Sequence, residues 1–267
     1  MSKIPFVKYH GAGNDFILID DRRGLWSDRI HDSWVAHVCH RRFGIGADGL
    51  IILQPGIDGA DFFMKYYNSD GRTSTFCGNG GRCIVAFAAK LGMNNGTFKF
   101  LGTDGWHSGV INEDESVCLS MTEVHQIDRV DEKSYTLFTG SPHYVTFDDD
   151  LQNIDVRETG RAIRNSQPFS KEGINVNFIE SLGPSEIKIR TYERGVEDET
   201  MACGTGVVAA AIANAFHNND FSGECIVHAS GGDLNVRFSR KDAENFTEVM
   251  LIGPAEEVFR GEIDLKD

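Results

Sequence analysis

The sequence predicts an α+β protein whose two halves share one design. Short segments of alternating apolar and polar residues outnumber the stretches with helical periodicity, and the two kinds do not follow each other in strict alternation. One pattern of strand, loop and helix occurs twice, about half a chain apart. The 267 residues suffice for one large or two small domains, and the 40% hydrophobic content suffices for a core.

The predicted strands are short and are separated by turn residues. They span residues 4–10, 15–20, 50–53, 62–68, 97–102, 116–121, 134–140, 143–147, 174–180, 185–193, 224–230, 233–238 and 247–253. Four stretches have the apolar spacing that is typical of helices. These predicted helices span about 32–43, 80–91, 156–163 and 206–216.

The acidic composition narrows the expected partners. A formal charge of −14 repels phosphate backbones, so no nucleic-acid partner is expected. No window approaches the roughly 18 apolar residues of a membrane span and no export signal is visible, so we expect a cytoplasmic protein without a membrane partner. Six cysteines are too few for a disulfide scaffold and are expected as thiols.

The repeated pattern places one cysteine in each half. Tyr67–Leu91 reads YNSDGRTSTFCGNGGRCIVAFAAKL, and Tyr192–Phe216 reads YERGVEDETMACGTGVVAAAIANAF. Each copy is a strand ending in tyrosine, a polar loop, a Cys-Gly-x-Gly turn and an apolar helix. We therefore expect a first domain of residues 1–122, joined by a C-terminal strand at 256–267, and a second domain of residues 123–255. The duplication also predicts a two-sided active site between the halves.

Cys77 and Cys203 are the candidate reactive groups. A thiol immediately before a helix lies among the unpaired N–H groups of the first turn, where the positive end of the helix dipole favours the thiolate. A single such cysteine is more simply a small buried residue at a turn, but its duplication favours a function. The amides that follow each thiol are expected to bind a carboxylate, as helix N-termini bind anions; they belong to Gly78, Asn79, Gly204 and Thr205.

No other pattern indicates a competing chemistry. No Cys and His spacing is typical of a metal site, so no metal is expected. Gly44–Gly49 (GIGADG) matches a dinucleotide-binding pattern, but a predicted helix precedes it and a strand follows, which reverses the order that such a site needs. The remaining cysteines lie in apolar periodic contexts and are expected to be inert core residues: Cys39, Cys83, Cys118 and Cys225.

Two activated thiols are suited to inverting a carbon centre. One thiolate removes a proton from one face of the carbon, and the other thiol returns a proton to the opposite face. Helix N-termini stabilise the charge that spreads onto the substrate carboxylate. The residues therefore predict racemisation or epimerisation of an α-amino acid without a cofactor.

Five motifs, in order over nearly the whole chain, also give a resemblance to a known family. They are HGAGNDF (His10–Phe16), YNSDGRTSTFCGNGGRC (Tyr67–Cys83), GSPHYV (Gly140–Val145), GINVNF (Gly173–Phe178) and YERGVEDETMACGTG (Tyr192–Gly206). Together they resemble the diaminopimelate epimerases. The resemblance implies a two-domain fold in which the strands of each half wrap around a central helix.

The resemblance also implies a reaction and its residues. The reaction is the interconversion of LL- and meso-diaminopimelate without pyridoxal phosphate, for lysine and peptidoglycan synthesis, by a homodimer. Cys203 is implied as the proton acceptor in the LL-to-meso direction and Cys77 as the donor, with His143 and Glu193 tuning the thiols. The implied substrate contacts are Asn14, Asn68, Gly78, Asn79, Asn175, Glu193, Arg194, Gly204 and Thr205.

The chain departs from the family pattern at three places. Gly49 stands where the family often has Gln, so a side-chain contact there is lost or is made by water or backbone. Ser141 stands where the family often has Asn before Pro-His, and it keeps a hydroxyl in reach. The loop between Glu193 and Cys203 is one residue longer than in many relatives.

Two other functions remain open from the sequence. A proline or hydroxyproline racemase of the same fold also pairs two cysteines, although His10–Phe16 and Arg194 favour the longer substrate. From another class, Cys77 and Cys203 suit a thiol redox or binding protein. Entry of deuterium at an α-carbon distinguishes an isomerase from that second class.

Overall fold

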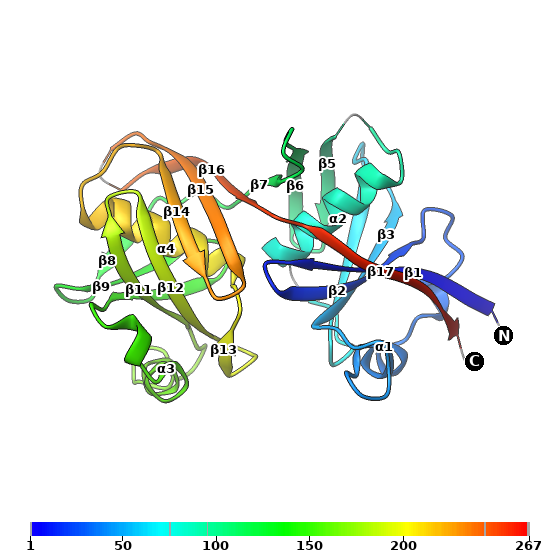
Figure 1. Ribbon diagram of the computed structural model, residues 1–267, viewed down its shortest axis with the longest axis horizontal. Helices are drawn as coiled ribbons and strands as arrows, with labels where there is room; N and C mark the ends of the chain where they lie inside the picture. The colour runs from blue at the N-terminus through cyan, green and yellow to red at the C-terminus, as the bar shows by residue number, and fades with distance from the viewer. Residues whose placement is uncertain (1, 75, 95, 243, 266–267) are drawn as a thin grey trace. The chain divides into compact units, whose positions relative to one another are not determined.

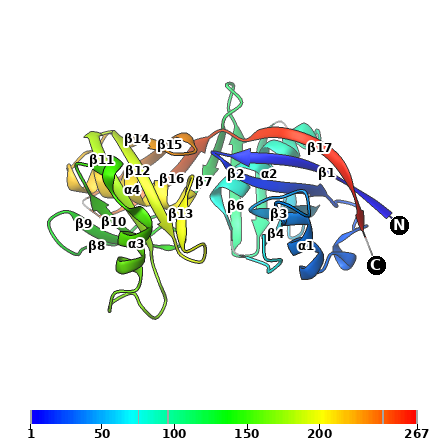
Figure 2. The same cartoon turned by 60° about the horizontal axis from the view of Figure 1, so that its bottom comes forward.

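The computed structural model describes residues 2–74, 76–94, 96–242 and 244–265, which form two compact units. Unit 1 contains the described residues of 1–119 and 254–267, and unit 2 those of 120–253. In each unit a mixed sheet surrounds a helix (Figures 1 and 2). The described residues form 17 strands and four α-helices, which confirms the α+β prediction. No helix in this part of the chain is long and apolar enough to cross a membrane.

Unit 1 begins with a hairpin whose first strand also pairs with the last strand of the chain. β1 and β17 are antiparallel neighbours and run side by side in both views (Figures 1 and 2). The elements of this unit are β1 (Ser2–Gly11), β2 (Asn14–Asp20), a 3-10 turn (Ser27–Arg29), α1 (Asp32–Cys39), β3 (Gly49–Pro55), β4 (Phe62–Asn68), α2 (Gly78–Lys90), β5 (Thr97–Gly102), β6 (Gly105–Ile111), β7 (Val117–Ser120, its last residue in unit 2) and β17 (Glu256–Leu265).

Unit 2 repeats this plan around a second central helix. Its elements are β8 (Ile127–Arg129), β9 (Ser134–Phe138), β10 (Pro142–Phe147), a 3-10 turn (Leu151–Asn153), α3 (Val156–Arg164), β11 (Asn175–Gly183), β12 (Glu186–Glu193), β13 (Asp198–Thr200), α4 (Gly204–His217), β14 (Glu224–Ala229), β15 (Gly232–Arg240) and β16 (Phe246–Gly253).

Six strand pairings of unit 1 have a counterpart of the same direction in unit 2. In unit 1, β1–β2, β3–β4, β5–β6 and β6–β7 are antiparallel, whereas β2–β3 and β4–β5 are parallel. In unit 2, β9–β10, β11–β12, β14–β15 and β15–β16 are antiparallel, whereas β10–β11 and β12–β14 are parallel. α1 and α3 connect the first parallel pair of each unit, and α2 and α4 the second. The expected pseudo-symmetry is therefore confirmed.

Small side chains let each central helix fit among its strands. Residues 206–213 of α4 are all buried, and the helix contacts strands β9, β10, β11, β12, β14, β15 and β16. In α2, a Cβ on Gly80 would lie 2.9 Å from the Cδ1 atom of Ile51 in β3, so glycine permits the close approach of helix and sheet. This packing fixes the position of each helix N-terminus relative to its own unit.

The differences from the predicted elements have local causes. α1 ends at Cys39 instead of residue 43, because His40 adopts an extended conformation and its Nδ1 accepts the N–H groups of Arg42 and Phe43. α2 and α4 each begin two residues earlier than predicted, directly after the cysteines. β8 was not predicted because it has only three residues, and β6 was not predicted because residues 105–111 carry weak alternation.

Candidate functional site

The first candidate thiol lies at the N-terminus of a helix, as the sequence predicts. Cys77 is the N-cap residue of α2, with extended backbone angles (φ −115°, ψ 120°), and its carbonyl accepts the N–H of Gly81 at 2.7 Å. The N–H groups of a helix's first turn have no carbonyl partner within the helix. The half-buried side chain of Cys77 therefore stands beside the positive end of the α2 dipole.

Asn14, the first residue of β2, accepts a hydrogen bond from this thiol. The Cys77 Sγ donates to Asn14 Oδ1 at 3.6 Å, and Asn79 Nδ2 donates to the same oxygen at 3.2 Å. Asn14 Nδ2 donates to the Asp48 carboxylate at 2.7 Å. Because a carboxylate only accepts, this bond fixes the Asn14 amide so that its oxygen faces Cys77.

A fully buried cation lies behind this group. Arg82, on α2, is 0% exposed, and its Nη2 donates to Asn79 Oδ1 at 2.9 Å while its Nε donates to the carbonyl of Pro254 at 3.3 Å. Its Nη1 is buried without a hydrogen-bond partner among the described residues. Burial lowers the pKa of Arg82, and the charge of the guanidinium favours the thiolate form of the neighbouring Cys83 and Cys77.

The second candidate thiol occupies the equivalent position in unit 2. Cys203 is the N-cap residue of α4, again with an extended backbone (φ −108°, ψ 111°), and its carbonyl accepts the N–H of Val207 at 2.8 Å. Its Sγ lies 3.5 Å from the Oγ1 atom of Thr205 in the first turn. Both cysteines thus begin a helix, but their hydrogen-bond neighbours differ in kind: an amide oxygen at Cys77 and a hydroxyl at Cys203.

His143 connects to Cys203 through that hydroxyl. The ring is fully buried on β10, and its Nε2 lies 2.9 Å from Thr205 Oγ1. Burial, with the nearby Arg194 charge, lowers the pKa of His143 to about 3, so the ring is neutral at physiological pH.

Asn175 and Arg194 form the polar wall beside His143. Asn175 is the partner of His143 in the register of β10 and β11, and its Oδ1 accepts the backbone N–H of Arg194 at 2.8 Å. Ser141 Oγ accepts from Asn175 Nδ2 at 3.1 Å and from Arg194 Nη2 at 3.3 Å. Arg194 Nη1 donates to the carbonyl of Glu172 at 3.0 Å, so backbone and Ser141 orient the guanidinium. The serine that departs from the family pattern thus takes part in holding Arg194.

The remaining candidate residues lie at strand ends. Glu193 ends β12, and its Oε2 accepts from Thr200 at 3.1 Å. Asn68 ends β4 opposite Gly49 in the strand register. A Cβ on Gly49 would lie 2.6 Å from the Tyr66 ring, so that ring occupies the space of any side chain at this position.

The surroundings of the other buried cysteines disfavour their thiolate forms. Cys39, Cys83 and Cys225 are at most 2% exposed. Burial raises the pKa of Cys39 and of Cys225 to about 12 and also raises that of Cys83. Cys118 is half-buried on β7.

The sequence patterns did not predict several residues that adjoin the candidate site. Asp48 lies within the GIGADG turn. Arg82 lies in the interior of a mostly small and apolar helix, and a charged residue at such a position was the available signal. Asn177 and Thr191 are buried polar residues on β11 and β12. Among the residues that the structure describes, no group of three or more His, Cys, Asp or Glu side chains is arranged to hold a metal ion.

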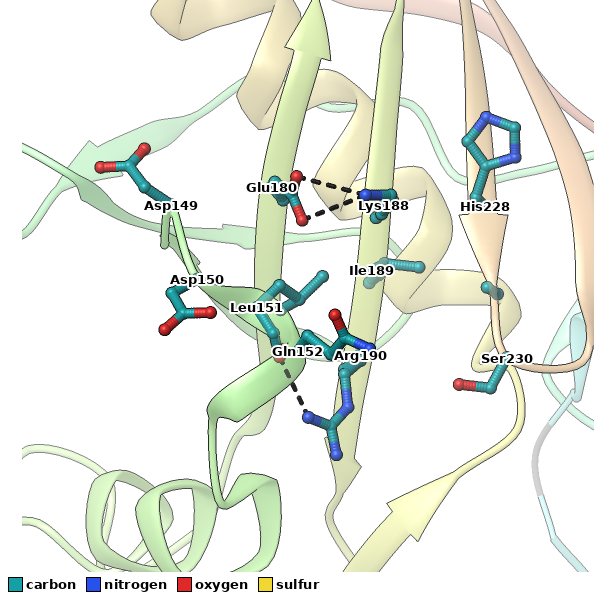
Figure 3. A pocket seen from close by; sticks show the side chains of 11 residues that line it. Asp149, Asp150, Leu151, Gln152, Glu180, Lys188, Ile189, Arg190, His228 and Ser230 are labelled. Atoms are coloured by element: carbon teal, nitrogen blue, oxygen red, sulfur yellow. Dashed lines mark hydrogen bonds and ion pairs between the residues drawn. The ribbon is translucent and has the colours of Figure 1, made fainter.

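A groove of about 520 Å³ on unit 2 contains none of these candidate residues (Figure 3). Its two cationic side chains already have partners: Lys188 pairs with Glu180 at 3.2 Å, and Arg190 pairs with Glu199 at 2.7 Å and donates to the carbonyl of Leu151 at 3.0 Å. The candidate chemistry therefore lies at the helix N-termini and not in this groove. Its lining residues are Asp149, Asp150, Leu151, Gln152, Glu180, Lys188, Ile189, Arg190, His228, Ala229 and Ser230.

Solved structures with the same fold define the class of protein. The chain is similar to a PhzF-family phenazine biosynthesis protein of Bacillus anthracis, with a TM-score of 0.75, 15% identity and coverage of 98% of this chain and 99% of that chain. It is also similar to a hydroxyproline epimerase of Agrobacterium vitis, with a TM-score of 0.68, 14% identity and coverage of 99% and 93%. At these identities the likeness shows the fold, which is the sheet-rich α+β fold shared by these proteins.

Sequence comparison identifies the family within this class. The family model of diaminopimelate epimerase matches residues 6–126 and 135–258. The chain is 46% identical over 256 residues to the diaminopimelate epimerase of Flavobacterium psychrophilum, covering 96% of this chain and 98% of that one. It is 41% identical over 262 residues to that of Chlorobaculum tepidum, covering 96% and 99%. The chain belongs to the diaminopimelate epimerase family and is an isomerase, which confirms the resemblance of the five motifs.

Proposed function

We propose that the chain interconverts LL- and meso-diaminopimelate by two-base chemistry, with Cys203 as the base and Cys77 as the acid in the LL-to-meso direction. The observation that carries this assignment is the contrast between the hydrogen bonds of the two thiols. Cys77 donates to the amide oxygen of Asn14, whereas Cys203 lies beside the hydroxyl of Thr205. An amide oxygen stabilises a thiol, and a hydroxyl donor stabilises a thiolate.

The proposed reaction moves one proton off the substrate and one onto it. The Cys203 thiolate takes the α-proton, and the electron pair left on the α-carbon spreads into the adjacent carboxylate. The Cys77 thiol then gives its proton to the opposite face of the carbon. The product leaves the two cysteines in exchanged protonation states, which proton exchange with water resets.

The two helix N-termini provide electrostatic stabilisation for this step. We assign the backbone amides of Gly78, Asn79, Gly204 and Thr205 to the carboxylate at the reacting carbon. Charge develops on that carboxylate in the transition state, and fixed N–H dipoles aimed at it lower the barrier. The extended N-cap conformation of both cysteines places these amides next to the thiols.

The far end of the substrate needs groups for a second carboxylate and for ammonium groups. We assign the Arg194 guanidinium, oriented by Ser141 and Glu172, to the distal carboxylate. The amide oxygens of Asn14, Asn68 and Asn175 and the carboxylate of Glu193 suit the ammonium groups and the remaining polar contacts. His143 and Glu193 are further proposed to tune the thiols.

The physiological setting extends this proposal. The reaction serves lysine and peptidoglycan synthesis, and we expect the enzyme in the cytoplasm as a homodimer that works without pyridoxal phosphate. We also propose that residues 1–122 with 256–267, and residues 123–255, act as its two domains.

Deuterium incorporation tests the proposal directly. The purified protein is incubated in D₂O with LL-diaminopimelate, proline or hydroxyproline, and the α-proton signals are followed by NMR. We expect loss of the α-proton signal and formation of the meso isomer with diaminopimelate alone. Exchange only with proline or hydroxyproline would assign the racemase activity instead, and no exchange with any substrate would favour a thiol redox or binding protein.

A further inference from the structure

Asn177 is a fully buried side chain whose amide has partners on both sides. It lies on β11 and is 0% exposed. Its Nδ2 donates to the carbonyl of Tyr144 at 3.0 Å and lies 3.1 Å from His143 Nδ1, while its Oδ1 accepts from the Thr191 hydroxyl at 3.0 Å. Every polar atom of the amide is therefore engaged.

These partners fix which way the amide points. A backbone carbonyl only accepts, so the Tyr144 carbonyl must face the NH₂ group of Asn177. The second proton of that NH₂ group then points at His143 Nδ1, 3.1 Å away, which accepts it. Asn175 Nδ2 also lies near the ring, 3.4 Å from His143 Nε2, but its closer acceptor is Ser141 Oγ at 3.1 Å, so the shorter contact at Nδ1 sets the tautomer. A neutral imidazole with an accepting Nδ1 carries its proton on Nε2.

We propose that Asn177 is a positioning residue that holds the proton of His143 on Nε2 and thereby directs the Thr205 hydroxyl proton toward the Cys203 thiolate. This inference rests on the proposed role of Cys203 as the base. It extends that role to Asn177, a buried side chain for which no contact with substrate is expected.

The chain of bonds follows from the tautomer. With a proton on Nε2, His143 donates to Thr205 Oγ1 at 2.9 Å, and the single proton of that hydroxyl is available to Cys203 Sγ at 3.5 Å. With a proton on Nδ1, Nε2 would become an acceptor and would attract the Thr205 proton away from the sulfur. The His143, Thr205 and Cys203 side chains hold the same number of protons in both arrangements. Asn177 therefore decides only the direction of the hydrogen bonds that join them.

The charged groups around this chain of bonds are few. Arg194 is the charged side chain whose field acts on His143. Glu193 precedes Arg194 at the end of β12, and its carboxylate accepts a hydrogen bond from the Thr200 hydroxyl. The other neighbours of the ring are neutral: Leu137 on β9, Asn175 on β11 and Thr205 on α4.

The tautomer is measurable in the unaltered enzyme. Protein labelled with ¹⁵N-histidine distinguishes a protonated from an unprotonated ring nitrogen by NMR, and the signal that disappears in His143→Gln assigns the ring. We expect His143 with a protonated Nε2 and an unprotonated Nδ1 from pH 5 to pH 9. A protonated Nδ1 in this range would overturn the inference without any reference to activity.

The effect on the thiol is measured with Asn177→Leu, which keeps a similar shape but donates no hydrogen bond. Alkylation of Cys203 by iodoacetamide is followed against pH by mass spectrometry of its peptide. Loss of a hydrogen bond to a charged group is expected to raise the midpoint of this profile by about one pH unit. At pH 7 we expect kcat to fall about tenfold with KM for LL-diaminopimelate nearly unchanged.

Asn214→Leu is the matched control. Asn214 is an equally buried asparagine of unit 2 on α4, and its Nδ2 donates to the carbonyls of Gly183 and Pro184. We expect this variant to lose stability without a shift in the Cys203 profile. A folded Asn177→Leu protein with an unshifted profile would overturn the inference. Failure of the wild type to epimerise diaminopimelate would instead contradict the proposed function, since the NMR and alkylation readouts need no substrate.

Discussion

Arg82 donates a 2.9 Å hydrogen bond to Asn79 from a guanidinium that is entirely buried. Asn79 in turn donates a hydrogen bond to Asn14, which also accepts a hydrogen bond from the Cys77 thiol. Burying a cation costs stability unless an opposite charge compensates it, and in the described part of the chain the hydrogen bonds of Arg82 go to an amide and a backbone carbonyl, not to a carboxylate. Three hydrogen bonds link Arg82 to Cys77, which indicates that the buried charge acts on this thiol, because a positive charge favours a thiolate.

Replacement of Arg82 tests this relationship. Arg82→Met removes the charge but keeps a long apolar side chain in the buried space. We expect slower alkylation of Cys77 at pH 7, by about threefold or more, because the thiolate loses a favourable charge. Peptide mass spectrometry measures the rate. Lys90→Met, at the exposed end of the same helix, serves as the control and should leave the Cys77 rate unchanged.

The two cysteines are expected to be individually essential. Cys77→Ala and Cys203→Ala should each lower kcat for epimerisation by at least about 100-fold, because one remaining group cannot both remove and return the proton on opposite faces. Circular dichroism should show an unchanged fold. Near-normal turnover by either variant would contradict two-base chemistry. Cys39→Ala, outside the helix N-termini, should retain turnover.

Arg194 is expected to determine binding more than turnover. Arg194→Lys keeps the charge but loses the planar fork that matches a carboxylate, so KM for LL-diaminopimelate should rise about tenfold or more. Arg157→Lys, which changes an exposed arginine of the same unit, is the matched control. Wild-type kcat/KM in Arg194→Lys would remove this residue from the carboxylate site.

Stability should fall in acid partly because of His143. Burial lowers the pKa of this ring from 6.5 to about 3, so below pH 6.5 the unfolded chain binds a proton that the folded chain refuses until about pH 3. Stability is therefore lost as the pH falls through this window, by up to about 1.4 kcal/mol per pH unit. Urea titrations at pH 7, 5.5 and 4.5 should show a smaller loss in His143→Gln. His125→Gln, at an exposed ring, should keep the wild-type loss.

The Tyr66 ring is expected to leave no room for a side chain at position 49. Gly49→Ala introduces a Cβ 2.6 Å from both Tyr66 Cε2 and the carbonyl of Tyr67, so we expect a loss of about 1–3 kcal/mol in the free energy of unfolding. Gly183→Ala is the control, because a Cβ there meets nothing within 4 Å. Equal stability of the two variants would show that the Tyr66 ring moves aside without cost.

Much of the fold was predictable because its signals are local. Alternating side chains marked most strands, and the predicted helices at 80–91 and 206–216 correspond to α2 and α4. Weakly patterned elements were missed, such as β6 and the three-residue strands β8 and β13. Short strands gain their stability from neighbours in the sheet, and their own sequence carries little of that information.

The sequence by itself determined the duplicated plan, the family and the position of Cys77 and Cys203 at helix N-termini, because a Cys-Gly-x-Gly turn before an apolar helix is a local pattern. Only the tertiary structure decided what each thiol touches. Asn14 reaches Cys77 from β2, and His143 reaches Thr205 from β10, across more than sixty residues of chain in each case. Such contacts depend on strand register and helix packing, which bring side chains from distant parts of the chain together. No regular spacing in the sequence records these contacts, so the sequence alone does not predict them.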